Sequence, residues 1–160
     1  MDPYQRALEW LSQDPDSDTR ADLQMALETP DSIEIEQQFT SEIAFGTAGL
    51  RGELGFGPRR MNRVVVARAA AGIGTYLLRR ERSPRVVIGF DSRHNSETFA
   101  RDTAEILQGL GVEALLLPHF VPTPVLAFAI RYLAADAGIM VTASHNPATD
   151  NGYKVYLGDA

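Results

Sequence analysis

Three short apolar runs lie in the second half of the chain: "RVVIGF" at 85–90, "VEALLL" at 112–117 and "AGIMVT" at 137–142. Each run is rich in Val, Ile or Leu and is bounded by turn residues. Unbroken apolar runs of this length are typical of strands that are covered on both faces. The pattern therefore predicts three strands of a largely parallel sheet.

Two helical patterns separate these strands. The first has steps of 4, 3 and 4 residues, which form one helical face: Phe99, Thr103, Ile106 and Leu110. Gly111 follows as the predicted C-terminal cap. The second helix is predicted to begin at Thr123 as the N-cap, with Pro124 as its first residue. The alternation of strands and helices predicts right-handed crossovers and an α/β fold.

The last ten residues, "NGYKVYLGDA", indicate a further strand, because Tyr153, Val155 and Leu157 alternate with Lys154. Asn-Gly is typical of a turn, so we expect 143–152 to be a loop and the strand to return antiparallel beside 138–142. The sheet would then be mixed but mostly parallel and covered by helices, with this last strand as an open edge. Lys154 would lie near the base of the loop.

The N-terminal segment 1–40 has a different pattern, with ten of the 21 acidic residues and few β-branched ones. Its apolar spacing predicts a short helix at Ala7, Leu8 and Leu11. A second helix is predicted at Leu23, Ala26 and Leu27, with Asp18 or Thr19 as its cap. We interpret 1–40 as a helical extension packed on a domain that spans 41–160.

The segment "FGTAGLRGELGFGP" at 45–58 contains five glycines, which favours a loop, or a strand broken by loops, over a helix. A helix is predicted directly after it, again with steps of 4, 3 and 4 residues at Val66, Ala70, Ile73 and Leu77.

Composition narrows the class of protein. The 160 residues carry a net charge of −6, which disfavours nucleic-acid binding, and they include no cysteine. No apolar run approaches the ~20 residues of a membrane helix, and the start lacks the layout of a signal peptide. We therefore expect a cytoplasmic protein without nucleic-acid or membrane partners.

Polar residues follow two of the predicted strands. Asp91, Ser92 and Arg93 come after "RVVIGF", and "TASHNP" at 142–147 ends the run "AGIMVT". Ligands of open α/β sheets collect at the carboxyl ends of parallel strands, so these side chains are expected in one crevice. Ser144 could be an ordinary loop residue, because Ser, Asn and Pro are common in loops, or it could carry chemistry.

The sequence favours a phosphate carrier among the chemical roles of Ser144. A hydrolase elbow needs glycine where Thr142 and Asn146 stand. No Walker A motif occurs, and His94, His119 and His145 lack the spacing of a helical metal-binding pair. A phosphoserine, in contrast, needs cations to balance its charge, and the candidates are Arg51, His145 and Lys154.

Five motifs together resemble the α-D-phosphohexomutase superfamily, which contains the phosphoglucomutases and phosphomannomutases. In chain order they are "FGTAGLRG", "DSRHNS", "PTPVLAFAI", "TASHNP" and "NGYKVY". The resemblance covers about 41–160, which corresponds to the N-terminal domain I of that superfamily. The sequence of the first motif and the 40-residue leader are most similar to the branch with phosphoglucomutase-2, phosphopentomutase and bacterial phosphomannomutase-like proteins.

The resemblance implies a role for each candidate residue. Ser144 would be phosphorylated, would donate its phosphoryl group to a sugar monophosphate, and would supply one oxygen to Mg²⁺ through its phosphate. A bound bisphosphate such as glucose 1,6-bisphosphate would be the intermediate and activator. Arg51 would contact the phosphate, and Lys154, ahead of His145, would transfer the proton. The residues expected to brace the loop are Asp91, Arg93 and Asn146.

The superfamily has four domains, and the later ones supply further metal ligands, the sugar-selecting loop and the second phosphate site. Because the chain stops at Ala160, we expect a domain I that is truncated at its C-terminal end, inactive alone, with the missing domains and a phosphosugar as its partners. The open alternatives are a phosphopentomutase or phosphoglucosamine mutase domain, or a stand-alone, non-catalytic sugar-phosphate-binding or regulatory protein.

Overall fold

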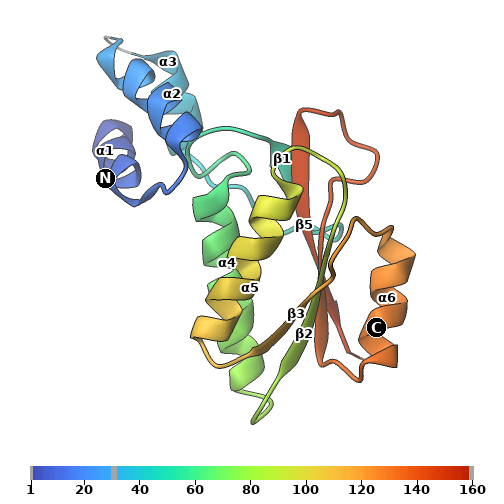
Figure 1. Ribbon diagram of the computed structural model, residues 1–160. Coiled ribbons are helices and arrows are strands. Elements are labelled where there is room, and N and C mark those ends of the chain that lie inside the picture. Colours follow the sequence, from blue (N-terminus) through green and yellow to red (C-terminus); the bar gives the residue numbers. More distant parts are fainter. Residues whose placement is uncertain (1, 30–31, 159–160) are drawn as a thin grey trace.

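The computed structural model describes residues 2–29 and 32–158, and within these ranges the chain forms six helices and one five-stranded sheet (Figure 1). The predicted end of the domain, at 159–160, lies outside the described residues. No helix of the described part of the chain is long and apolar enough to cross a membrane.

The sheet has the strand order β1-β5-β4-β2-β3. Strand β2 pairs in parallel with β3 and β4, whereas β5 pairs antiparallel with both β4 and β1. The prediction of a mixed, mostly parallel sheet covered by helices is therefore confirmed, because β5 alone runs opposite to the other four strands. The strands are β1 (Leu50–Glu53), β2 (Arg85–Phe90), β3 (Glu113–Leu116), β4 (Ala137–Val141) and β5 (Asp150–Leu157).

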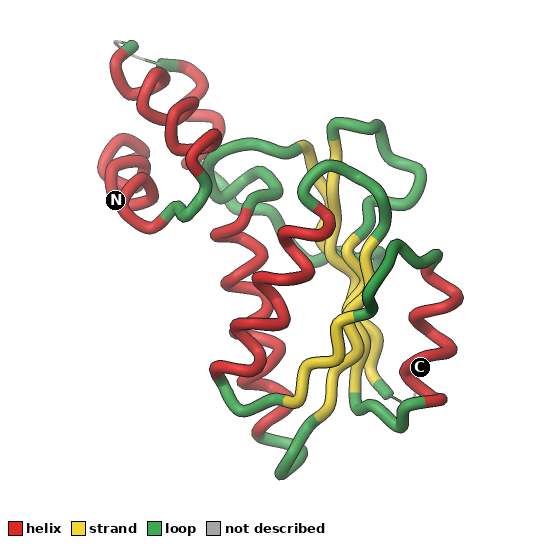
Figure 2. The backbone as a smooth tube through the Cα atoms, in the orientation of Figure 1, coloured by secondary structure: helices red, strands yellow, loops and turns green. Residues whose placement is uncertain are grey.

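Helices cover the two faces of the sheet unequally (Figure 2). Helices α4 (Arg63–Leu78) and α5 (Ser96–Gly109) lie on one face, and α6 (Thr123–Tyr132) lies on the other. Strands β3 and β4 flank β2 on opposite sides, so the crossovers through α5 and α6 run in opposite directions. Right-handed crossovers in opposite directions place their helices on opposite faces.

The face under α4 and α5 carries most of the core. Val86, Ile88 and Ile139 are fully buried there, and so is Tyr153, whose hydroxyl lies 3.0 Å from Thr103 Oγ1. Burial raises the pKa of the Tyr153 hydroxyl, which keeps it neutral. This face is closed by apolar packing along its length.

The face under α6 has a smaller core, which forms where α6 packs against β2 and β4. Val87 and Met140 alternate with the residues of the other face and point toward Leu126 and Ile130. Gly138 lets α6 approach closely, because a Cβ at this position would collide with Ile130. Helix α6 leaves the β1 and β5 side of this face uncovered.

Three helices form the N-terminal segment: α1 (Pro3–Gln13), α2 (Ser17–Glu28) and α3 (Ile33–Phe39). Helix α3 was not predicted. The predicted caps of α2 are wrong, because the N-cap is Asp16, whose side chain accepts a hydrogen bond from the Asp18 amide at 2.9 Å. The predicted Ala7 and Leu11 pack inward together with Trp10, whereas Leu8 is exposed.

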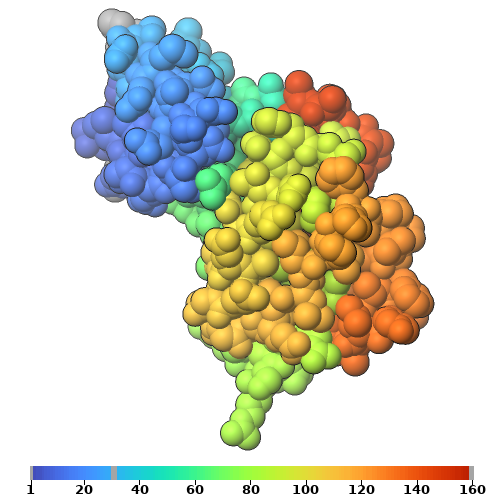
Figure 3. Space-filling model, viewed as in Figure 1, coloured from blue at the N-terminus to red at the C-terminus, as the bar shows by residue number. Residues whose placement is uncertain are grey.

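These helices form a lobe against the rest of the molecule, seen in blue in Figure 3. The Phe39 ring stacks on Phe56, with centroids 6.4 Å apart, and the Arg68 guanidinium lies 4.8 Å from the centre of the Trp10 ring. One apolar cluster includes side chains from both segments. The boundary between 1–40 and 41–160 stays a prediction.

The C-terminal part differs from expectation in two ways. Asn151-Gly152 is not a turn, because β5 already begins at Asp150, and β5 is an interior strand since β1 pairs with its other side. A Cβ at Gly152 would lie 2.6 Å from the Thr142 carbonyl oxygen and 2.8 Å from that of Leu50. Glycine is thus needed here for the close approach of three strands, not for a turn.

The ends of α5 and α6 are close to expectation. Gly111 follows the C-cap of α5 with a φ of 91°, the left-handed conformation that ends a helix. Helix α6 has Pro122 as its N-cap, so Thr123 and Pro124 are its first two residues, and the cap lies one position earlier than predicted.

Candidate active site

Ser144 lies on the loop 142–149, which leaves the carboxyl end of β4 and returns as β5. Its φ is 59°, a left-handed conformation that costs a non-glycine residue about 1–2 kcal/mol. The Ser144 amide donates to Oγ1 of the buried Thr142 at 3.0 Å, which offsets part of this cost. The serine itself is exposed, so its hydroxyl is accessible from solvent.

The guanidinium of Arg93 holds the backbone of this loop. It donates four hydrogen bonds of 2.6–3.0 Å to main-chain carbonyl oxygens, namely those of Ser144, Asn146, Pro147 and Asp150. Hydrogen bonds from a charged donor are stronger than neutral ones. The shape of the loop is therefore tied to one side chain that follows a different strand.

Asp91 and Asn146 complete the local contacts. Asp91 Oδ1 accepts from the Arg93 amide at 3.0 Å, and Oδ2 lies 3.4 Å from Arg93 Nε. Asn146 Nδ2 donates to Asp150 Oδ2 at 2.9 Å within the loop. The structure thus brings Asp91, Arg93, Asn146 and Ser144 together at the carboxyl ends of β2 and β4.

Arg51 and Lys154 lie beside each other on β1 and β5. Arg51 pairs with Gly152, and Lys154 pairs with Met140, so both project from the face that Thr142 and Gly152 share. Both line a cavity of about 280 Å³ whose other wall is the glycine-rich segment 45–49. Arg51 Nε donates to the Ala48 carbonyl oxygen at 3.1 Å.

Two effects lower the pKa of the Lys154 ammonium. Burial is the larger, and the positive charge of Arg51 is the second. Both disfavour the charged form of an amine, so Lys154 releases its proton more readily than an ordinary surface lysine. This is the shift that a lysine used for proton transfer needs.

The predicted histidine, His145, is not among the residues that line the cavity of Arg51 and Lys154. His145 follows Ser144 in the loop and is exposed, with its ring accessible to a ligand. Among the residues that the structure describes, no three His, Cys, Asp or Glu side chains gather in a way that could hold a metal ion.

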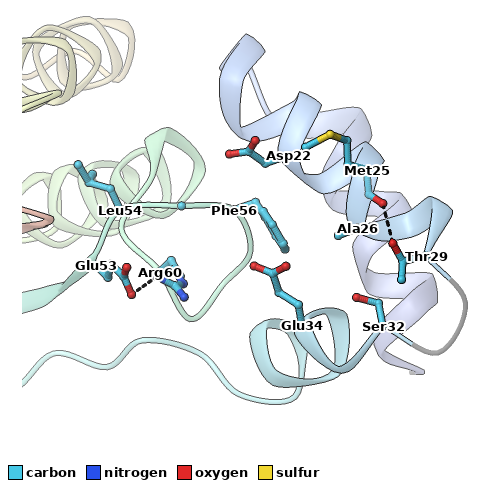
Figure 4. Close-up of a pocket in the computed structure, with 11 residues that line it drawn as sticks. Asp22, Met25, Ala26, Thr29, Ser32, Glu34, Glu53, Leu54, Phe56 and Arg60 are labelled. Carbon is cyan, nitrogen blue, oxygen red and sulfur yellow. Dashed lines mark hydrogen bonds and ion pairs between the residues drawn. The ribbon is translucent and has the colours of Figure 1, made fainter.

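A larger cavity, of about 520 Å³, lies between α2, α3 and the segment 53–60 (Figure 4). Its wall includes Asp22 and Glu34 and an ion pair between Glu53 and Arg60. None of the residues predicted for the site lines it. The structure thus brings the predicted residues together in two groups, Arg51 with Lys154 at the smaller cavity and Ser144 with Asp91, Arg93 and Asn146 at the loop.

Sequence reasoning missed two residues that shape the loop, Thr142 and Asp150. Thr142 holds the Ser144 amide, and Asp150 binds both Asn146 and, through its carbonyl, Arg93. A threonine two residues before a loop serine is a known source of local hydrogen bonds to the backbone, so its position was a usable signal.

This chain is similar to a family of known proteins. Residues 42–160 match the family model described as phosphoglucomutase/phosphomannomutase, alpha/beta/alpha domain I. A "probable phosphomannomutase" of Haemophilus influenzae is 62% identical over 100 residues, which are 62% of this chain and 21% of that protein. A "probable phosphoribomutase" of Schizosaccharomyces pombe is 43% identical over 164 residues, covering 99% of this chain and 28% of that protein.

A crystal structure shows the same fold. It is of a Thermus thermophilus protein whose name includes phosphomannomutase, and it matches with a TM-score of 0.68 and 40% identity over 74% of this chain and 26% of that chain. The chain thus spans about a quarter of the length of these relatives. The motifs, the fold and the family model agree, and the chain belongs to the phosphoglucomutase/phosphomannomutase family.

Proposed function

We propose that this chain is the phosphoserine-bearing domain of a phosphosugar mutase, which interconverts a sugar 1-phosphate and a sugar 6-phosphate. The observation that carries the proposal is Ser144, exposed in a left-handed conformation on a loop that Arg93 holds through four carbonyl oxygens. The names of the relatives, phosphomannomutase, phosphoglucomutase and phosphoribomutase, support the same class of reaction.

The proposed reaction has two phosphoryl transfers. A sugar hydroxyl oxygen attacks the phosphorus of phosphorylated Ser144, the bond between phosphorus and Ser144 Oγ breaks, and a bound sugar bisphosphate forms. The hydroxyl proton passes to a base, and Ser144 Oγ takes up a proton. In the second transfer Ser144 Oγ loses its proton to a base and attacks the phosphorus of the other phosphate of the bisphosphate. The bond between that phosphorus and its sugar oxygen breaks, the sugar oxygen takes up a proton, and the isomeric monophosphate leaves the restored phosphoserine.

The residues of this chain supply positioning and charge for these steps, which is most of what phosphoryl transfer requires. We assign proton transfer to Lys154, because its lowered pKa gives it a larger neutral fraction near neutral pH than an ordinary lysine. Arg51 faces the same cavity and would bind phosphate oxygens. His145, exposed beside Ser144, would add a further phosphate contact.

Mg²⁺ and a sugar bisphosphate such as glucose 1,6-bisphosphate are the proposed cofactors. Mg²⁺ prefers six oxygen ligands, whereas the described residues gather no set of three side chains for a metal. The phosphate of Ser144 would give one oxygen, so the residues described do not form a complete metal site. When bound, Mg²⁺ would offset the charge of the transferring phosphoryl group.

We also propose further domains and a cellular compartment for this enzyme. Phosphosugar orientation and the remaining metal ligands would come from domains like those in the other three quarters of the relatives. Absence of cysteine suits a reducing compartment, so we propose a cytoplasmic enzyme.

Phosphopeptide mapping tests the proposal. The full-length protein that carries this chain is incubated with Mg²⁺ and glucose 1,6-bisphosphate, digested and analysed by mass spectrometry, beside a Ser144→Ala variant. We expect one phosphate on Ser144, and loss of both the phosphate and mutase turnover in the variant. Phosphate on Ser92 or Ser96 instead, or full turnover by the variant, would refute it.

A further inference from the structure

Two buried polar residues, Ser96 and Asn151, lie behind the candidate site and have no part in the chemistry assigned above. Both are fully buried. Ser96 is the first residue of α5, and Asn151 is the second residue of β5, three positions before Lys154. A buried polar side chain costs free energy unless it is hydrogen-bonded, so their bonds indicate what they do.

The side chain of Asn151 is fully engaged. Its Nδ2 donates to the His94 carbonyl oxygen at 2.8 Å and to Ser96 Oγ at 3.0 Å, and its Oδ1 accepts from the Gly152 amide at 2.7 Å. Asn151 therefore joins β5 to the start of α5.

The hydroxyl of Ser96 continues the connection. It accepts from Asn151 and donates to Asp91 Oδ1 at 2.7 Å, so its single proton and one lone pair are both used. Asp91 in turn receives the Arg93 amide and faces the Arg93 guanidinium. Arg93 ends the series on four carbonyl oxygens of the Ser144 loop.

We propose that Ser96 and Asn151 are positioning residues, which fix Ser144 through hydrogen bonds from Asn151 to Ser96 and from Ser96 to Asp91, and then through the ion pair between Asp91 and the Arg93 guanidinium. We name these four residues the loop support. Because Asn151 and Lys154 share one strand, the loop support also sets Ser144 relative to the proposed proton-transfer group. The inference deepens the proposed function and rests on it.

The physical reason for such a support is the geometry of phosphoryl transfer. The reacting oxygen and phosphorus must be held close and in line, and a misplacement of about 1 Å can cost about 100-fold in rate. The loop 142–149 is largely exposed and contains few apolar anchors. Buried residues must therefore hold the loop in place. The loop support connects the buried Ser96 and Asn151 to the loop backbone through hydrogen bonds and the Asp91–Arg93 ion pair.

Ser96→Ala is the first test variant. It removes the central hydroxyl, yet Asn151 keeps its bond to His94 and Asp91 keeps its bond to the Arg93 amide. Tyr153→Phe is the matched control, because it also removes a buried hydroxyl contact. Tyr153 lies on β5, the strand of Asn151, but its hydroxyl contacts Thr103 and takes no part in the loop support. Ser96→Cys is the second variant, which keeps a side chain of similar shape while weakening both hydrogen bonds.

Two measurements on the full-length protein separate positioning from general stability. Amide hydrogen exchange of Ser144 and Asn146 should become about 2- to 12-fold faster in Ser96→Ala, the factor for losing one hydrogen bond. Turnover should fall by about 10- to 100-fold, as misplacement predicts. Ser96→Cys should shift both values in the same direction, and Tyr153→Phe should leave both near those of the unchanged protein.

A double-variant comparison tests the route. In an Arg93→Lys background, Ser96→Ala should cause little further change in loop exchange or turnover, because the connection is already broken. Additive effects would overturn the proposal, and so would unchanged loop exchange or unchanged turnover in Ser96→Ala. Hydrogen exchange does not depend on mutase activity, so if the unchanged protein proves inactive, the proposed function fails while loop exchange still decides whether the loop support holds the loop.

Discussion

The two faces of the sheet differ in how completely the chain covers them. Under α4 and α5 the face is closed by a broad apolar core that includes Phe99 and Tyr153. On the opposite face α6 covers β2 and β4, and the neighbouring β1 and β5 present Arg51 and Lys154 to a cavity of about 280 Å³.

The two faces are therefore expected to have different roles: the apolar core under α4 and α5 stabilises the fold, and the charged residues of β1 and β5 are available to ligands. Burial of large apolar side chains supplies most of the folding free energy, so the closed face is where substitutions should unfold the protein. Charged groups on the open face gain little from packing, and the lowered pKa of Lys154 and its accessibility suit it to ligands. Substitutions of the charged residues Arg51 and Lys154 should therefore change turnover and leave stability nearly unaltered.

The largest expected effect is a complete absence of turnover in the isolated 160-residue chain, although its closed face suffices for folding. On the proposed function, Ser144 would offer a metal one oxygen through its phosphate, and the groups that orient the distal phosphate of a sugar bisphosphate would come from further domains. A coupled mutase assay with Mg²⁺ and glucose 1,6-bisphosphate, beside a circular dichroism spectrum, checks this. Turnover well above that of a Ser144→Ala control would show that the open face is catalytically complete.

Lys154→Met should be the next largest effect. Loss of a general acid or base lowers turnover by about 10²- to 10⁴-fold. The thermal unfolding midpoint should stay close to that of the unchanged full-length protein, because Lys154 is only partly buried. Steady-state kinetics and thermal unfolding of the same samples give both values. A loss of less than about tenfold would return Lys154 to an ordinary surface residue.

Phe99→Ala should have the opposite signature on the closed face. Phe99 is fully buried in the larger core, and removing such a ring costs about 3–5 kcal/mol of unfolding free energy. Urea unfolding of the variant measures the loss, with the exposed Phe128→Ala as its matched control, since that ring lies 64% exposed on α6. Equal losses for the two variants would contradict the distinction between the faces.

The smallest expected effect is a dependence of stability on pH that comes from Lys154. Its pKa is lower in the folded protein than in the unfolded chain, because of burial and of Arg51. Between these two pKa values the unfolded chain binds more protons, so the free energy of unfolding rises with pH across that window. Below the window both states are protonated and the slope vanishes.

Urea unfolding at several alkaline pH values measures this slope, and Lys154→Met should remove it. The difference between the two proteins is the informative quantity, because Tyr153, whose pKa is raised, contributes a slope of the opposite sign to both. A slope that is the same in both proteins would show that the open face does not perturb Lys154.

The periodicity of apolar residues along the chain predicted the buried strands and helices well, and it predicted short or exposed helices poorly. The three strands, α4, α5 and α6 follow from apolar runs and helical spacing, which burial enforces directly. Helix α3 has only seven residues, too few for a periodic signal. Leu107, outside the predicted face of α5, is fully buried, whereas Leu110, on the predicted face, is 40% exposed.

The candidate site was predictable as a set of residues, and its geometry was not. Strand ends and motifs point to Ser144, Asp91 and Arg93, since parallel strands share one carboxyl edge. The bonds of Arg93 to residues more than fifty positions away depend on tertiary structure. Asn151-Gly152 misled because its local preference for a turn is overridden by pairing with β1 and by a buried asparagine side chain.

Arg93 holds its loop through main-chain carbonyl oxygens, which every amino acid carries. Replacing a side chain in the loop therefore leaves all four acceptor atoms in place, provided that the backbone can keep its conformation. Much of the shape of the loop is thus held from outside it, by Arg93 after β2, in addition to the contacts of Thr142 and Asn146 within the loop. Substitution of an exposed loop side chain such as His145 should therefore disturb the loop backbone less than substitution of Arg93.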